Sequence, residues 1–126
     1  MPRVQRENTA VVLYLRDGAV DEVERLLHAM KARVDRCATG SAAVERVRER
    51  SYRCVITPLQ LPDMDAYALI GALREIAPGL KAIVILDTPG VSEAVAVMHA
   101  GAHAVVDSRL LSTGLYHNVA PLLRDA

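Results

Sequence analysis

Three acidic residues stand at or just after the ends of apolar runs that are long enough to be buried strands: Asp17, Asp87 and Asp107. Carboxylate oxygens are the ligands that hard cations such as Mg²⁺ prefer, so these residues are candidate cation ligands. The run "CVITP" ends instead at Pro58, whose side chain has neither a nucleophile nor an oxygen. Because the first run supplies only one carboxylate, we expect no metal to bind there.

Other patterns that would indicate an enzyme or a metal protein do not occur in the sequence. The four histidines have no ligand spacing, and the two cysteines, Cys37 and Cys54, lie in predicted strands as buried, reduced thiols. The sequence contains no Ser-His-Asp pattern, phosphate-binding glycine loop or CxxC motif. We therefore expect no catalytic residue, no metal, no cofactor and no enzymatic activity.

The elements that position these residues alternate between two kinds of apolar periodicity. Short continuous apolar runs, or an alternating run in one case, predict strands at residues 10–15, 33–38, 54–58, 82–87 and 103–107. Apolar residues at helical spacing predict helices at residues 19–32, 41–50, 66–77, 91–101 and 112–125. Strict alternation of strands and helices indicates an α/β protein, with a parallel sheet covered by helices on both faces.

Turn and capping residues mark several boundaries between these elements. Ser41 and Asp65 are suited to begin the second and third helices, and Asp63 belongs to the turn between strand and helix. Gly101 is expected to end the fourth helix, and Pro121 to bend or shorten the fifth.

Length, composition and charge limit the function classes further. The chain has 126 residues, 52% of them apolar, which suits one domain with one core; we expect that domain at residues 9–124, after a mobile arm at residues 1–8. Fifteen basic residues balance fifteen acidic ones, so no net field attracts nucleic acid or an anionic membrane. Without a membrane span or a signal peptide, the expected location is the cytoplasm.

Four segments carry a resemblance to a known family. "LQLPDMDAY", "RDGAVDEVERLL", "AIVILDTPG" and "MHAGAHAVVDS" are similar in register and spacing to segments of the receiver domain of bacterial response regulators, over residues 9–124. The resemblance implies the (βα)5 flavodoxin-like fold, a five-stranded parallel sheet in the order 2-1-3-4-5. It also implies a phosphorylation switch, in which two acids and an aspartate bind Mg²⁺ and the aspartate accepts a phosphoryl group.

Each functional position of that family is changed in this sequence. The family places its acidic pair, phosphoacceptor aspartate, hydroxyl residue, lysine and switch aromatic at positions occupied here by Leu15 and Arg16, Pro58, Asp87, Ser108 and Val105. A register slip of one residue supplies only Asp17 to the acidic pair. The resemblance therefore implies a degenerate pseudo-receiver that lacks the phosphoacceptor aspartate. Asp63 and Asp65 could be substitute phosphoacceptors, but the roles of Asp63 in a turn and of Asp65 as a helix cap are favoured.

Two residues of opposite charge fall at positions of this pocket. Arg16 and Asp87 occupy neighbouring positions in the family, so a guanidinium and a carboxylate could pair where metal and phosphate would bind. In the alternative interpretation, Arg16 points to solvent.

We expect the protein to act in bacterial signal transduction as a phosphorylation-independent module that binds a protein partner or itself. By resemblance, the docking or dimerisation face comprises the fourth helix, fifth strand and fifth helix, and would regulate an output domain such as a transcriptional regulator. The candidate residues on that face, several of which must also pack in the core, are Val91, Val95, Met98, Val105, Leu110, Leu111, Leu115 and Tyr116. The alternative is an unconventional switch that accepts phosphate or a small anion through Arg16 and Arg109.

One further surface is predicted from charge alone. Arginines gather around the second predicted helix, where they would form a solvent-exposed face or dock an acidic partner: Arg33, Arg36, Arg46, Arg48, Arg50 and Arg53. We expect no direct nucleic-acid binding by this domain, because Phe and Trp are absent and only four Tyr could stack on bases.

Overall fold

The computed structural model describes residues 9–13 and 19–124. The expected arm at residues 1–8 and the pocket residues Leu15, Arg16 and Asp17 lie outside the described residues. The described strands are β1 (Thr9–Leu13), β2 (Arg33–Cys37), β3 (Cys54–Pro58), β4 (Lys81–Leu86) and β5 (Ala104–Asp107). The helices are α1 (Ala19–Ala29), α2 (Gly40–Glu49), α3 (Ala66–Ile76), α4 (Val91–His99), the 3-10 turn η1 (Ser108–Leu110) and α5 (Leu111–Arg124).

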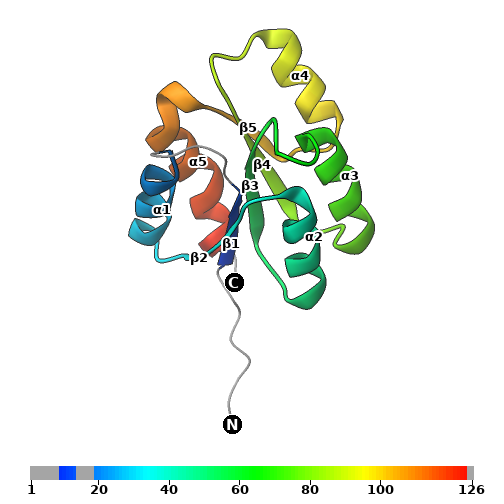
Figure 1. The fold of residues 1–126 in the computed structure, drawn as a ribbon. Helices are drawn as coiled ribbons and strands as arrows, with labels where there is room; N and C mark the ends of the chain where they lie inside the picture. Colours follow the sequence, from blue (N-terminus) through cyan, green and yellow to red (C-terminus); the bar gives the residue numbers. More distant parts are fainter. Residues whose placement is uncertain (1–8, 14–18, 125–126) are drawn as a thin grey trace.

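The strands form one parallel sheet in the order β2-β1-β3-β4-β5. Helices α1 and α5 cover one face of the sheet, and α2, α3 and α4 cover the other (Figure 1). This arrangement confirms the expected flavodoxin-like α/β fold. None of the helices in the described part of the chain is long and apolar enough to cross a membrane.

The core lies on both faces of the central strands. Ile56 of β3 packs in the cluster that contains Leu27 of α1 and Leu115 of α5, and all three are almost fully buried. Val55, the preceding residue, packs on the opposite face with Leu69 of α3. Because β3 is covered on both faces, its first four residues are buried, which explains why its sequence is a continuous apolar run.

Side chains and a glycine define several helix ends. Asp65 caps α3 by accepting a 2.9 Å hydrogen bond from the Ala68 N–H, as predicted. The prediction for α2 was wrong, because Thr39, rather than Ser41, is its N-cap and accepts a 3.1 Å hydrogen bond from the Ala42 N–H. Gly101, with φ of 116°, follows α4 in a conformation that favours glycine.

Candidate functional site

The carboxyl ends of β3, β4 and β5 bring three of the predicted pocket residues to one edge of the sheet. Pro58 is the last residue of β3 and is half-buried, in register with Ile85 of β4. At the end of a strand, the missing N–H of a proline disrupts the ladder least. Asp87 and Ser108 are the residues that directly follow β4 and β5. The edge expected to hold the chemistry therefore has Pro58 at the end of its central strand.

Asp87 and Ser108 contact each other directly. The Ser108 hydroxyl donates a 2.7 Å hydrogen bond to Oδ1 of Asp87. The contact follows from the strand register, because Leu86 of β4 is paired with Asp107 of β5 and the next residue of each strand is then a neighbour. The hydroxyl that follows β5 is thus bound to the carboxylate that follows β4, and this contact joins the ends of the two strands.

Asp107 and Arg109 form a second polar pair at the same edge. The Arg109 side chain donates to both carboxylate oxygens of Asp107, at 3.0 Å from Nε and 2.5 Å from Nη2. The Arg109 backbone N–H donates a further 2.9 Å hydrogen bond to the same carboxylate. These hydrogen bonds, first of all from the Arg109 guanidinium, lower the pKa of Asp107 to about 2. The guanidinium considered as an anion binder is therefore already engaged by an ionised carboxylate.

Asp63, one of the two substitute acceptors considered, binds the beginning of α2. Its carboxylate accepts hydrogen bonds from the Gly40 N–H at 2.9 Å, the Ser41 N–H at 3.0 Å and the Ser41 hydroxyl at 2.9 Å. These donors, chiefly the Gly40 N–H, lower the pKa of Asp63. Asp65 caps α3, so both carboxylates serve the amino ends of helices and anchor the loop after β3.

Thr57 was not singled out from the sequence, although it is the one buried polar residue among the described side chains. Its hydroxyl donates a 2.8 Å hydrogen bond to the carbonyl oxygen of Pro58. The signal for this contact was weak, since threonine is common in strands and its partner is a backbone group. The hydrogen-bonding capacity of the buried Thr57 hydroxyl is thus met by the backbone of the next residue.

The first-strand side of the pocket was predicted to contain Leu15, Arg16 and Asp17, which lie outside the described residues. The pairing of Arg16 with Asp87 therefore stays a prediction. Within residues 9–13 and 19–124, no group of three or more His, Cys, Asp or Glu side chains could hold a metal ion.

The candidate interaction face is partly exposed and partly core. Helices α4 and α5 both pack against β5, and large apolar side chains remain exposed on these helices and on the 3-10 turn. The exposed set comprises Val91 at 82%, Val95 at 49%, Met98 at 44%, Leu110 at 63% and Tyr116 at 57%.

Three residues predicted for that face do not lie openly on it. Leu111 and Leu115 are buried in the cluster between α1, α5 and the sheet, with 8% and 0% exposure. Val105 is half-buried and packs against the cluster on the opposite face. The prediction was wrong for the two leucines because one side of α5 must cover β5, and periodicity alone did not separate that side from the outer one.

Residues 16–115 match the family model of the response regulator receiver domain. No curated protein matched the chain in sequence.

Among solved structures, the chain is similar to a putative response regulator from Chloroflexus aurantiacus, with a TM-score of 0.85 and 21% identity, covering 94% of this chain and 99% of that one. It is also similar to the signal receiver domain of a putative LuxO repressor protein from Vibrio parahaemolyticus, with a TM-score of 0.84 and 16% identity over 94% and 92% of the two chains. A receiver domain of a sensor histidine kinase from Pseudomonas aeruginosa, described with a magnesium ion in its active site cleft, has a TM-score of 0.82 and 16% identity over 95% and 100%. At these identities the three structures show the shared fold.

Proposed function

The chain belongs to the response regulator receiver domain family of two-component signalling, and from this premise we propose that it is a pseudo-receiver that binds a protein without being phosphorylated. The observation that carries the proposal is the 2.7 Å hydrogen bond between Ser108 and Asp87, two positions where the family resemblance expects a lysine and a hydroxyl residue. The Asp87 carboxylate would repel an incoming phosphoryl group, and the neutral Ser108 cannot supply the positive charge of the lysine that it replaces.

The end of β3 and the loop that follows it also support the absence of phosphorylation. Pro58 stands at the position of the phosphoacceptor and has no nucleophile. Asp63 and Asp65, the nearest acidic residues in the following loop, are engaged at the amino ends of α2 and α3. Phosphorylation of either would remove a helix cap, and neither stands at the end of the strand.

Binding of a partner, or of a second copy, is supported by the apolar side chains of α4, the 3-10 turn and the outer side of α5. Val91, Leu110 and Tyr116 are each more than half exposed, which leaves apolar area that a partner would bury on binding. With no phosphoryl group to toggle this face, its occupancy would depend on the concentration of the partner. Regulation of an attached or separate output domain, such as a transcriptional regulator, is part of the same proposal.

The deciding experiment is the intact mass of the purified protein after incubation with acetyl phosphate and Mg²⁺. We expect no phosphoryl adduct, whereas an unmodified receiver domain with its aspartate, treated alongside, should gain one phosphoryl group. An adduct on this protein would overturn the proposal, and peptide mapping would then identify the acceptor.

Thermal unfolding in Mg²⁺ and beryllofluoride tests the alternative switch. A ligand that binds only the folded state must raise the melting temperature, so we expect no shift for this protein. A shift without a covalent adduct would favour the unconventional anion site at Arg16 and Arg109. Disruption of that shift by Arg16→Ala would assign the site.

A further inference from the structure

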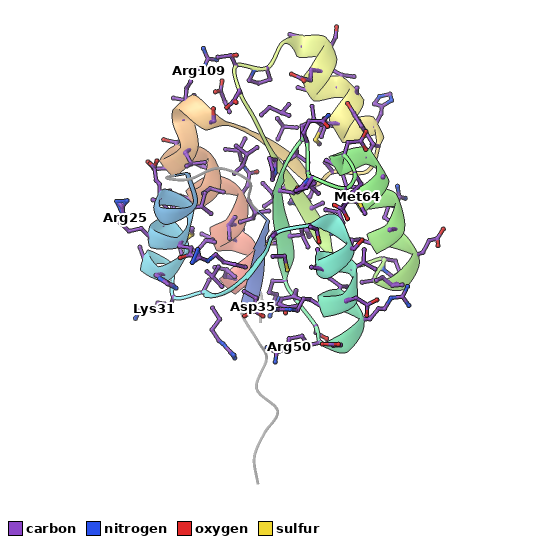
Figure 2. The ribbon with its side chains drawn as sticks, viewed as in Figure 1. Arg25, Lys31, Asp35, Arg50, Met64 and Arg109 are labelled. Atoms are coloured by element: carbon purple, nitrogen blue, oxygen red, sulfur yellow. The ribbon has the colours of Figure 1, made fainter. Side chains whose placement is uncertain are left out.

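The edge of the sheet at β2 is more basic than the protein as a whole. Residues 31–53 contain seven Lys and Arg against three Asp and Glu, whereas the complete chain has fifteen of each kind. Figure 2 shows Lys31, Asp35 and Arg50 at one end of the molecule, and Arg109 at the other. The basic region therefore lies away from the degenerate pocket.

Several side chains of this region converge on Asp35. Its Oδ2 accepts a 2.6 Å hydrogen bond from the Tyr52 hydroxyl and lies 3.6 Å from Nη1 of Arg50 and 3.7 Å from Nη1 of Arg46. Arg46 and Arg50 are one helical turn apart, and the Arg50 N–H still donates to the Arg46 carbonyl at 3.1 Å. A spacing of four residues places the two arginines on one side of the helix, but their shared partner on β2 depends on the packing of α2 against the sheet.

Tyr52 contributes no negative charge to the group. Burial, followed by the hydrogen bond to Asp35, raises the pKa of Tyr52 to about 12, so its hydroxyl stays protonated at neutral pH. One carboxylate, that of Asp35, thus faces two guanidinium groups. The group has a net positive charge before any other residue is considered.

The positive groups form the outer layer of this surface. The Asp35 side chain is 20% exposed, whereas those of Arg46 and Arg50 are 45% and 48% exposed. Arg33 is exposed and lies on the same side of β2 as Asp35, because side chains two residues apart on a strand share a face. A partner approaching β2 therefore meets guanidinium groups first.

We propose that Arg33, Arg46 and Arg50, here called the basic cluster, bind an acidic segment of a protein partner. Guanidinium groups match carboxylates in shape and charge, and their donors form paired hydrogen bonds with them. At 3.6 Å, the pair of Arg50 with Asp35 is longer than a direct hydrogen bond, so the Arg50 side chain can turn toward a new carboxylate at little cost. Arg46, 3.7 Å from Asp35, is also hydrogen-bonded to Tyr52 and holds the group together. The proposal concerns a separate site from the α4 and α5 face.

Other occupants fit this surface less well. A second copy would bring a like charge against the cluster, which opposes association through this edge. Nucleic acid would lack a stacking platform, because Tyr52 packs against the core cluster that contains Val55 and Leu69. An acidic protein segment needs neither an aromatic platform nor an apolar groove.

The test uses a fluorescein-labelled oligoglutamate peptide and fluorescence anisotropy at low ionic strength. We expect Arg33→Glu and Arg50→Glu each to weaken binding by about tenfold, and added salt to weaken the wild-type complex. Arg48→Glu is the matched control, because it makes the same charge change on an exposed residue of α2 that lies two positions from Arg46 and Arg50, on the other side of the helix. That control should change the affinity by at most about twofold.

Three results would overturn the proposal. The first is absence of peptide binding by the wild-type protein at low salt. The second is a loss of affinity in Arg48→Glu as large as that in Arg33→Glu and Arg50→Glu, which would indicate diffuse attraction instead of a defined cluster. The third is tighter binding of duplex DNA or of phosphatidylserine vesicles than of the peptide. Melting curves of each variant establish that it is folded, and Arg33→Glu keeps the test decisive if Arg50→Glu does not fold.

Discussion

The Ser108 hydroxyl and the Asp87 carboxylate are joined by a 2.7 Å hydrogen bond across the carboxyl ends of β4 and β5. By family resemblance these positions would hold a lysine and a hydroxyl residue that bind a phosphoryl group. Here the two residues bind each other, so the ends of the two strands are joined by a polar contact.

Removal of this hydrogen bond should destabilise the protein slightly. Ser108→Ala is expected to lower the free energy of unfolding by about 0.5 kcal/mol, the low end for a hydrogen bond, because the site is solvent-exposed. Urea unfolding at neutral pH measures the difference. Asp87→Asn keeps an acceptor for the serine and should cost less, and a larger loss in Asp87→Asn would show that the charge of Asp87 has another role.

Two glycines in helices should respond in opposite ways to replacement by alanine. At Gly71 of α3 an added Cβ meets no atom within 4 Å, so Gly71→Ala should stabilise the protein by about 0.5–1 kcal/mol through helix propensity. At Gly114 of α5 the Cβ would lie 2.6 Å from Cγ1 of Val106, and Gly114→Ala should destabilise the protein. Chemical denaturation of both variants checks the pair; stabilisation in both would mean that α5 moves away from β5 easily.

Substitutions on the buried and exposed sides of α5 should affect different properties, the first stability and the second association. Leu115→Ala should cost about 2–5 kcal/mol, because Leu115 is fully buried in the core. Tyr116→Glu, one residue further on, should leave the melting temperature nearly unchanged and weaken any self-association through the exposed face. Sedimentation velocity over a range of concentrations measures association, and identical profiles for wild type and Tyr116→Glu would remove this residue from the interface.

Asp63 should make the stability depend on pH in the acid range. Its pKa in the folded state lies below the ordinary value of 3.8, so the ionised carboxylate stabilises the folded protein above pH 3.8. That contribution is lost as the pH falls through the folded pKa. The difference in melting temperature between wild type and Asp63→Asn should therefore be largest at neutral pH and narrow below pH 3.8.

Ser41→Ala is the control for this pH dependence. It removes one of the three donors to Asp63 and leaves the two backbone N–H groups in place. The variant should be less destabilised than Asp63→Asn and should retain most of the acid dependence. A pH-independent difference between wild type and Asp63→Asn would show that the carboxylate contributes as a neutral hydrogen-bond acceptor.

Local sequence features were enough to predict the elements and some of their ends. The alternation of apolar runs with helical spacing predicted the order of strands and helices, because burial on one or both faces requires those periods. Asp65 was predicted as a cap because its partner, the Ala68 N–H, lies three residues away on the same helix. Interactions of this range depend on backbone conformation more than on the packing of distant segments.

The contacts that define the candidate site depend on segments far apart in the chain. Asp63 is 23 residues from Gly40, and Asp87 is 21 residues from Ser108, so no local pattern indicated these partners. The same limit applied to α5, where Leu115 and Tyr116 are adjacent apolar residues of which the packing of α5 on the sheet buries only the first.

Residue types and their spacing were sufficient to predict the α/β fold, the proline at the end of β3 and the excess of basic residues around α2, because each is a property of a local stretch of sequence. The hydrogen bond between Ser108 and Asp87, the contact of Asp63 with the start of α2 and the convergence of Arg46 and Arg50 on Asp35 became visible only in the folded structure. The physical reason is the short range of hydrogen bonds and ion pairs, which form only after packing of the helices on the sheet has brought distant side chains within a few ångströms.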